Sequence, residues 1–447
     1  MIRYLTDETH AFERTDILPA PSLKEPEMKL VKVYPQMQFQ HIIGFGAALT
    51  EAAGYVYAHM DDHTKEHFIR LCFGSSFNAY SLCRLAIQSC DFSLGPHAYC
   101  ESAPDAALSN FSIDHDRKYV LPLVKHALAV NPNISFLASP WSPPAWAKTN
   151  RTMKYGGHLR SSESDDWASI IARFISEYER EGIHIDRITV QNEVNARQTW
   201  ESCLFNAKQE IDFLSNHLKP ALEREGHGDV KILVWDHNKE GMLDRATAFL
   251  ADERASEFMD GVAFHWYSGD HFEALAATRQ AIGDKRELIF TEGCDFFTNG
   301  DEWWQLPHAE HYAHEIIGDI NAGANGFIDW NILLDSNGGP NHVQNFCDAP
   351  IMYDIDARRL MVRKPFLYLG HFSRFVKPGA RRLLCTSYTS DLETCAFANP
   401  DGSKVAIVLN RFGGTYPFYL NIDGGFVDEH SRFFLEAPSH SIQTICW

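Results

Sequence analysis

The sequence predicts an α/β fold, a (β/α)₈ TIM barrel with an appended β-sandwich built from the C-terminal segment and the N-terminal strand. Between about residues 40 and 335, a short β-branched run, a polar tip and an amphipathic segment follow one another repeatedly. Eight such strand and helix units form a barrel, and helical crossovers make its strands parallel. After about residue 375 apolar and polar residues alternate, which is typical of antiparallel strands. We therefore expect residues 41–374 to form the barrel, and residues 1–40 and 375–447 to form the sandwich.

Each of the eight predicted barrel strands is a short run that contains β-branched or aromatic residues, and most of them end in or next to polar residues. These strands are residues 41–47, 80–89, 134–141, 187–193, 230–238, 261–268, 287–293 and 325–333. Between them lie segments with helical periodicity, such as residues 207–226, where Gly226 suits the position that ends a helix. An open, doubly wound sheet is the alternative. Its phosphate-binding turn needs a third glycine, which the stretch containing Gly44 and Gly46 lacks.

The C-terminal region reads as several strands separated by turn sequences. Apolar and polar residues alternate in the stretches RRLLCTSYTS, ETCAFANPDGSKVAIVLNRF, TYPFYLNIDG and HSIQTICW. Asn-Pro-Asp-Gly and Gly-Gly are turn signals, so the simplest interpretation is an antiparallel sandwich. Residues 28–35, MKLVKVYP, read as a further strand that pairs with this module.

Composition limits the possible partners. The 40 basic and 59 acidic residues give a net charge of −19, and no run of lysines or arginines offers a surface for phosphates. We therefore expect a small-molecule partner and no nucleic acid.

No run approaches the ~18 apolar residues of a membrane span, so we expect no integral membrane association. The N-terminal stretch lacks the cationic and apolar regions of a secretory signal, which predicts a cytoplasmic protein. The sequence leaves the oligomeric state open.

The sequence predicts neither a metal nor a cofactor. The 10 cysteines are scattered, and none has the CxxC spacing of a zinc site, so buried free thiols are the better interpretation. His308, His311 and His314 are spaced by three residues, which spreads them over more than one face of a helix. We interpret these histidines as solvated surface residues rather than metal ligands.

Polar and aromatic side chains gather where the predicted barrel strands end. They are Arg84, Asp91, Trp141, Asn192, Glu193, Asp236, His237, His265, Trp266, Tyr267, Glu292, Asp329, Trp330 and Asn331. These ends face one shared mouth in a (β/α)₈ barrel. Glu193 and Glu292 each end a strong strand and lie three strands apart, so they could face each other. Two opposed carboxyl groups over an aromatic pocket are what glycoside hydrolysis needs. A single glutamate at a strand end is usually solvated or paired, so the pattern alone leaves a structural role open.

Several longer motifs resemble glycoside hydrolase family 30, in particular its glucosylceramidase-like branch. The matching stretches are GFGAALTEAA, SCDFS, ASPWSPPAWAKTN, QNEV, HWY, TEGC and DWNILLDSNGGPNHVQNF, in the family's order. They span nearly the whole predicted barrel. The resemblance implies the same barrel and a sandwich built from both ends of the chain.

The resemblance also implies roles for individual residues. Glu193 matches the family's acid/base and Glu292 matches its nucleophile. The residues that match substrate contacts are Asp91, Trp141, Asn192, His265, Tyr267, Trp330 and Asn345. Arg84 matches a supporting arginine that faces the carboxylates. The family's usual NEP is NEV here, and Val194 puts the leaving-group side in question.

We therefore expect a retaining exo-β-glycosidase that hydrolyses β-glucosides by double displacement. A β-xylosidase or a β-1,6-glucanase of the same family is the alternative, and a non-catalytic carbohydrate-binding barrel is the alternative from another class. Arg84 and Tyr267 should keep Glu292 ionised, and its charge should raise the pKa of Glu193. The carboxyl groups should lie ~5–5.5 Å apart. We interpret Asp236 and His237 as supporting residues behind the substrate contacts.

Overall fold

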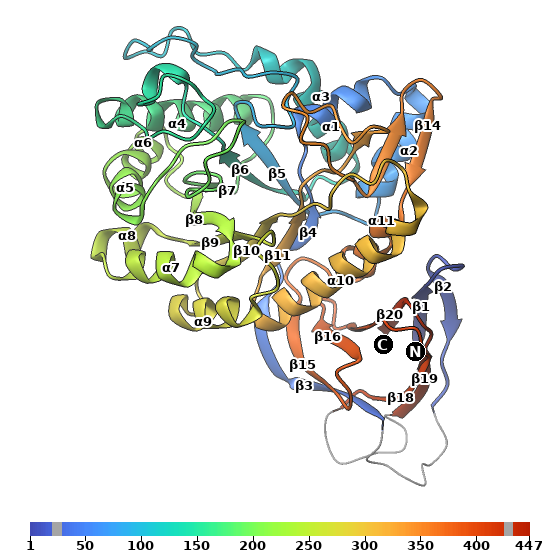
Figure 1. Cartoon of the computed structure of the whole chain (residues 1–447). Helices are drawn as coiled ribbons and strands as arrows, with labels where there is room; N and C mark the ends of the chain where they lie inside the picture. The colour runs from blue at the N-terminus through green and yellow to red at the C-terminus, as the bar shows by residue number, and fades with distance from the viewer. Residues whose placement is uncertain (20–28, 424–431) are drawn as a thin grey trace.

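The computed structural model of the chain describes residues 1–19, 29–423 and 432–447. It confirms the predicted barrel. Eight parallel strands form one sheet in the order β4-β11-β10-β9-β8-β7-β6-β5 (Figure 1). A parallel bridge between Ala48 and Arg84 joins its two edges. The strands are β4 (Gly44–Ala47), β5 (Leu82–Ile87), β6 (Ser135–Pro140), β7 (Arg187–Thr189), β8 (Lys231–Asn238), β9 (Gly261–His265), β10 (Glu287–Glu292) and β11 (Gly326–Asp329).

Helices follow the barrel strands along the chain and lie around them in Figure 1. They are α1 (Glu51–Ala58), α2 (Asp62–Phe73), α3 (Asp114–Val130), α4 (Ser164–Arg180), α5 (Ala207–Phe213), α6 (Lys219–Arg224), α7 (Met242–Leu250), α8 (Glu253–Phe258), α9 (Phe272–Ile282), α10 (Gln305–Ala322) and α11 (Lys364–Ser373). The predicted helix at 207–226 contains one π turn, Leu214–Leu218, just before Pro220, which has no N–H to donate. Gly226 follows the helix with φ of 85°, as expected.

The barrel strands are shorter than predicted. The strand expected at residues 187–193 ends at Thr189, so Glu193 lies in the turn beyond it. Strands β8 and β10 are irregular, with register shifts between Trp235 and His237 and between Phe290 and Glu292. A bulge redirects the side chains that follow it. The prediction was wrong about these strand ends because polar residues that continue a β-rich run give no local signal of a bulge or turn.

The barrel interior has an apolar layer with a polar layer above it. Buried apolar side chains from six strands pack together at its base: Leu82, Leu137, Leu233, Ala263, Ile289 and Ile328. Alternate residues of a strand face the same side, so the next inward position lies two residues later. Four of these six positions hold the polar residues Arg84, Ser139, His265 and Thr291, and the other two hold Trp235 and Trp330, all of them buried. The polar layer is therefore fixed by the same alternation that builds the core.

Gly46 has a steric role at the junction of β4 and β5. A Cβ atom on Gly46 would lie 2.0 Å from the carbonyl oxygen of Leu82, which cannot move without disturbing β5. We expect Gly46→Ala to cost roughly 1–3 kcal/mol, as overpacking does, and to lower the Tm in calorimetry. Gly413→Ala is the control, because a Cβ there meets no atom within 4 Å. Equal Tm values for the two variants would contradict this role.

The second unit contains one hydrogen-bonded sheet in the order β19-β18-β3-β15-β16-β17-β20-β1-β2. Its strands are β1 (Ile2–Thr6), β2 (Glu13–Asp16), β3 (Leu30–His41), β15 (Arg381–Ser387), β16 (Leu392–Ala398), β17 (Lys404–Asn410), β18 (Tyr416–Asn421), β19 (Arg432–Ala437) and β20 (Ser441–Cys446). Its apolar side chains form a core of their own, which includes Val31, Val408, Phe418 and Ile445. The predicted sandwich from both chain ends is confirmed.

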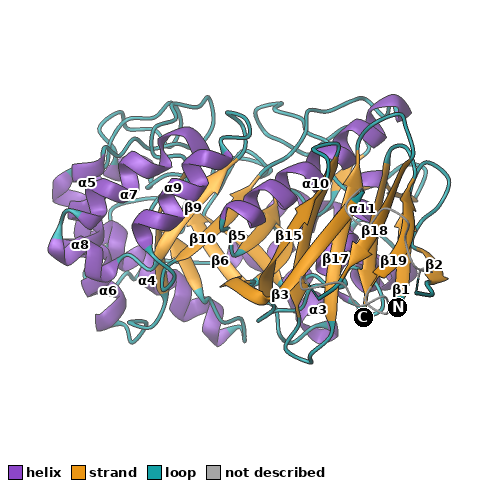
Figure 2. Cartoon of the chain, turned by 90° about the horizontal axis from the view of Figure 1, so that it is seen from below, coloured by secondary structure: helices purple, strands orange, loops and turns teal. Residues whose placement is uncertain are grey.

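Two details of this unit differ from the prediction. The strand expected at residues 28–35 corresponds to β3, and Met28 lies outside the described residues. β3 pairs antiparallel with β15 but parallel with β18, so the unit is not wholly antiparallel. Figure 2 shows the sandwich beside the barrel. α10 contacts β16, and α11 contacts β20.

Some features of the fold were not predicted. A small sheet follows β11 and consists of β12 (Leu334–Asp335), β13 (Ile351–Asp354) and β14 (Arg359–Val362).

His308 is buried, and His311 and His314 are half-buried against Asp295 and Glu393, so their predicted solvated positions were wrong. In the described residues all ten cysteines are free thiols. Within these same residues, no helix is both long and apolar enough to cross a membrane.

Candidate active site

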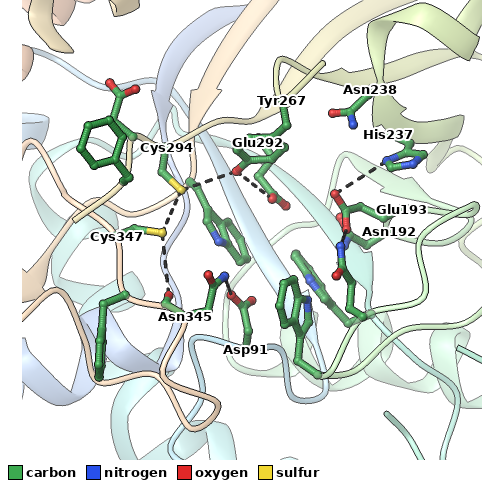
Figure 3. A pocket seen from close by; sticks show the side chains of 17 residues that line it. Asp91, Asn192, Glu193, His237, Asn238, Tyr267, Glu292, Cys294, Asn345 and Cys347 are labelled. Atoms are coloured by element: carbon green, nitrogen blue, oxygen red, sulfur yellow. Dashed lines mark hydrogen bonds and ion pairs between the residues drawn. The ribbon is translucent and has the colours of Figure 1, made fainter. Parts of the chain in front are cut away.

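A cavity of about 440 Å³ lies at the carboxyl ends of the barrel strands. The predicted site residues that line it are Asp91, Trp141, Asn192, Glu193, Tyr267, Glu292, Trp330 and Asn345. Figure 3 shows the Glu193 and Glu292 side chains pointing into this one cavity. The two predicted residues that do not line it are Arg84 and His265, which are fully buried beneath it.

Arg84 connects several polar groups beneath the cavity. Its Nη1 donates to Glu292 Oε2 at 2.8 Å, and its Nη2 donates to Asn192 Oδ1 at 2.9 Å and Asp236 Oδ2 at 2.7 Å. Hydrogen bonds between charged groups are strong and directional when solvent is excluded. Arg84 therefore fixes one predicted catalytic carboxylate and the amide beside the other, as its predicted supporting role requires.

Asp236 stands behind the cavity, whereas His237 faces it. Asp236 is fully buried, and the hydroxyls of Thr189 and Thr291 each donate to it at 2.6 Å. This position agrees with its interpretation as a supporting residue. His237 lines the cavity, so its interpretation as a residue behind the substrate contacts was wrong. The bulge between Trp235 and His237 explains the difference, because it changes which side chain faces inward.

Glu193 is held in an unusual backbone conformation. Its φ is 49°, in the left-handed region, and its N–H donates to the carbonyl of Asp236 at 2.8 Å. Gln198 Nε2 donates to Glu193 Oε2 at 3.1 Å. On the other side, Nδ1 of His265 and Nδ1 of His237 lie 3.6 and 3.7 Å from Glu193 Oε1. The carboxyl group is thus fixed from two sides.

The pKa of Glu193 is shifted opposite to the prediction. Burial acts to raise this pKa, but the approach of His237 and His265 outweighs burial and holds it well below its usual range. The prediction considered only the negative charge of Glu292. It was wrong because two imidazoles from neighbouring strands lie close to Glu193.

Glu292 is held by two donors. Besides Arg84, the Tyr267 hydroxyl donates to Glu292 Oε1 at 3.1 Å. Burial raises the pKa of Glu292, His265 and Arg84 lower it, and the negative charge of Glu193 raises it again, so the pKa lies above its usual value. We expected Arg84 and Tyr267 to favour full ionisation. The difference arises because two carboxylates share one buried space.

His265 does not contact the cavity, so its predicted substrate-binding role was wrong. The ring is fully buried, because β9 directs it into the barrel interior. Its Nε2 lies 3.1 Å from Asp236 Oδ1, and its Nδ1 faces Glu193. Burial acts to lower the pKa of His265, but the charges of Glu292, Asp236 and Glu193 raise it to about 9. His265 is therefore an imidazolium at neutral pH that lies between Asp236 and Glu193.

The raised pKa of His265 predicts a pH-dependent stability. Protonation of His265 stabilises the fold fully below its usual pKa of 6.5, and this contribution is lost as the pH rises through about 9. We expect the Tm to fall more steeply between these pH values in the unmodified protein than in His265→Gln. Calorimetry across this range measures both slopes, and parallel slopes would contradict the predicted shift.

Asp91 lies on the opposite side of the cavity from His237 (Figure 3). The side-chain amides of Asn341 and Asn345 donate to Asp91 Oδ2 at 3.2 and 3.3 Å. Trp141 and Trp330 stack on each other with ring centres 4.9 Å apart, and both line the cavity. Burial, together with the charge of Glu292, raises the pKa of Asp91 well above its usual range. This side therefore offers an aromatic wall and hydrogen-bonding groups, which suits a sugar ring.

Sequence reasoning missed part of the cavity lining. The additional residues are Gln198, Trp200, Asn238, Cys294, Asp295, Phe296, Phe346 and Cys347. Several follow a recognised motif by a few residues, as Gln198 follows Glu193 and Cys347 follows Asn345. The thiol of Cys294 donates to the sulfur of Cys347 at 3.2 Å. Proximity to a motif was the only signal that could have identified these residues.

Each of two groups of described residues could provide three metal ligands. Each group places its ligand atoms within 4.8 Å of one another: Glu193 with His237 and His265, and Glu51 with His97 and His115. Two histidines and a glutamate are a ligand set used by zinc. A cation in the first group would occupy Glu193 Oε1, and the carboxyl group could then no longer exchange a proton.

Comparisons with known proteins agree with this geometry. The family description "Glycosyl hydrolase family 30 TIM-barrel domain" matches residues 42–376, and "Glycosyl hydrolase family 30 beta sandwich domain" matches residues 379–445. The crystal structure of SrfJ from Salmonella typhimurium superposes with a TM-score of 0.95 at 38% identity, and the match covers 100% of this chain and 99% of that one.

Two curated enzymes are similar over most of their length. The lysosomal acid glucosylceramidase of Mus musculus is 32% identical over 443 residues, or 94% of this chain and 83% of that enzyme. The endo-1,6-beta-D-glucanase of Neurospora crassa is 28% identical over 397 residues, or 85% of this chain and 80% of that enzyme. Both domains of the fold and the cavity with two carboxyl groups thus lead to one conclusion: the chain belongs to glycoside hydrolase family 30 and is an enzyme that hydrolyses O-glycosyl bonds.

Proposed function

We propose that the enzyme is a retaining exo-β-glycosidase that hydrolyses β-glucosides by double displacement. The observation that carries this proposal is the placement of Glu193 and Glu292 in one cavity with different partners. Glu292 is the nucleophile, held by Arg84 and Tyr267, and attacks the anomeric carbon to form a glycosyl ester. Glu193 donates a proton to the leaving oxygen and then accepts one from the attacking water.

Because the pKa of Glu193 is lowered, its carboxyl group is ionised in the free enzyme. The mechanism requires that this group carry a proton when the leaving oxygen departs. His265 keeps a proton up to about pH 9, and its Nδ1 lies 3.6 Å from Glu193 Oε1. Glu193 regains in each cycle the proton that it gave to the leaving oxygen, because it takes one from the attacking water, and His265 stays protonated beside it. Esterification of Glu292 then removes one negative charge, which lowers the pKa of Glu193 further and favours its role as base.

The remaining residues position the sugar. Asn192, fixed by Arg84, faces the sugar 2-hydroxyl, and Asp91 with Asn345 holds hydroxyls on the other side. Trp141 and Trp330 lie against the ring. A cavity of about 440 Å³ has the size of a small-molecule site, which supports a short glycoside rather than a long polymer.

The glucanase activity of the Neurospora crassa relative supports a second candidate, hydrolysis of β-1,6-glucan. Trp200, Phe296 and Phe346 also line the cavity, and such rings could bind a further sugar on the leaving-group side. The two candidates differ in whether a polymer is accepted.

A substrate panel separates these possibilities. Purified enzyme is assayed with aryl β-glucoside, xyloside, galactoside and fucoside, and with β-1,6-glucan, with Glu292→Gln as the blank. We expect the highest kcat/KM for the glucoside and slow release of glucose from the glucan. Rapid production of oligosaccharides from the glucan would favour the second candidate, and preference for the xyloside would indicate a β-xylosidase.

A further inference from the structure

A second cavity, of about 380 Å³, lies between the barrel and the sandwich. We call it the basal cavity, and we define it by Gln40, Arg279, Lys285, Arg286, Arg381 and Arg382. It is at the opposite end of the barrel from the active site, because it also contacts Glu287, the first residue of β10, whereas Glu292 is the last. Its residues come from β3, α9, β15 and the segment that precedes β10.

The basal cavity is positively charged in a chain of net charge −19. The only two carboxylates among its described lining residues are Asp284 and Glu287. Glu287 is already paired, since Arg187 donates to both of its oxygens and Lys231 forms an ion pair with it. In the part of the chain that the structure describes, none of the five lysine and arginine residues of the basal cavity forms an ion pair with a carboxylate.

Two of these arginines have structural partners that use their N–H groups. Arg279 donates to the carbonyls of Gly323, Gly283 and Arg286 and to Asn325 Oδ1. Arg286 donates to carbonyls on the neighbouring helices in the same way. These contacts bring no counter-charge, because carbonyl and amide oxygens carry no net charge, and the charge of Arg279 is offset only at longer range by Asp284 and Glu287.

Arg382 lines the basal cavity and has unused donors. The residue is only 8% exposed, its Nε donates to Gln40 Oε1 at 3.2 Å, and its guanidinium lies 3.7 Å from the ring centre of Phe39. Gln40 is itself fixed, because its Nε2 donates to the carbonyls of Ile320 and Ala324. Among the described residues, neither terminal nitrogen of Arg382 has an acceptor, although the side chain lines the cavity.

A guanidinium that is largely buried without an anion is costly, because the protein supplies no counter-charge beside it. Burial lowers the pKa of Arg382 to about 10, which reflects this cost. Arg381 lies beside it at the rim, where one nitrogen donates to the carbonyl of Phe39. Lys285 adds a further positive charge at the exposed edge.

We propose that the basal cavity binds a small anion through a phosphate group. Arg382 would hold the phosphate from below with its two free terminal nitrogens, and Arg381 and Lys285 would approach it from the rim. A planar guanidinium matches two oxygens of a phosphate at once. The volume admits either inorganic phosphate or a phosphate monoester of a small metabolite. Such a ligand would link β3 and β15 of the sandwich to the barrel and should stabilise the junction between them.

The test is calorimetric titration of the full-length enzyme at constant ionic strength. The ligands are inorganic phosphate, a hexose monophosphate, citrate and chloride. We expect saturable binding of one phosphate group per chain and a rise in Tm with phosphate. Tighter binding of the monoester would identify a phosphorylated metabolite, and equal or tighter binding of inorganic phosphate would identify the free ion. Absence of saturable binding, or equal binding of citrate or chloride, would overturn the proposal.

Three variants with the same change of charge locate the site. We expect Arg382→Gln to weaken phosphate binding at least tenfold and Arg381→Gln about fivefold, whereas Arg224→Gln, at an exposed helix position, leaves it unchanged. Hydrolysis of an aryl glycoside reports that each variant is folded. If Arg382→Gln does not fold, the phosphate affinity of Arg381→Gln tests the site instead. Unchanged phosphate binding in folded Arg382→Gln would overturn the assignment. If that variant cannot be folded, unchanged phosphate binding in Arg381→Gln would overturn it. This site is independent of the substrate proposed above.

Discussion

Glu292→Gln is expected to lower kcat on aryl β-glucosides by at least ~10⁴-fold, because no other group can bond to the anomeric carbon. The amide keeps the size of the side chain and can still accept a hydrogen bond from Arg84. Arg84 also keeps its contacts with Asn192 and Asp236, so the cavity should persist. The loss should therefore appear in kcat at an almost unchanged Tm. Steady-state assays with a chromogenic glucoside measure it.

The matched control is Glu257→Gln, the same substitution at an exposed position of α8 that does not line the cavity. It should leave kcat and Tm unchanged. If Glu292→Gln kept more than a hundredth of the activity while folded, Glu292 could not be the nucleophile.

Glu193→Gln is expected to separate substrates according to their leaving groups. A dinitrophenyl glucoside needs no proton to depart, so formation of the glycosyl ester should stay fast. A methyl or alkyl glucoside needs the acid, and its hydrolysis should slow ~10²–10⁴-fold. Breakdown of the ester also slows, because the water loses its base. Azide, a nucleophile that needs no base, should then restore turnover of the activated substrate.

The measurement is kcat and kcat/KM for both substrates, with and without azide. Recovery by azide together with a glycosyl azide product of β configuration would support the acid/base role of Glu193. Equal losses on both substrates, with no response to azide, would mean that Glu193 only positions other groups. If Glu193→Gln and Glu292→Gln behaved alike on the activated substrate, the assignment of the two roles would fail.

The barrel could be predicted from the sequence because each of its strands carries its own local signal. The β-branched run at 187–193 ends in polar residues, and helical periodicity follows it at 207–226. The positions of Glu193 and Glu292 followed from this order, since strand ends in a barrel share one mouth. The sandwich was predicted for the same reason, from the alternation of apolar and polar residues and the turn sequences between its strands, and the family resemblance implied it as well.

The features of the site that could not be predicted depend on contacts between segments that are distant in the sequence. His265 looked like a substrate contact because it follows a strand, yet β9 directs it into the interior. The pKa order of Glu193 and Glu292 depends on imidazoles that approach through space. The bulge before Glu292 leaves no mark in the sequence. Arg382 became notable only when folding placed it in a cavity where no carboxylate of the described residues forms an ion pair with it.

The proposed mechanism requires a covalent bond between the substrate and Glu292. An activated fluorinated glucoside forms a glycosyl ester that breaks down slowly, and mass spectrometry of the digested protein locates the added sugar. We predict one sugar per chain on the peptide that contains Glu292, and none on that peptide in Glu292→Gln. A sugar attached to Glu193, or full hydrolytic activity without any attached sugar, would contradict the mechanism.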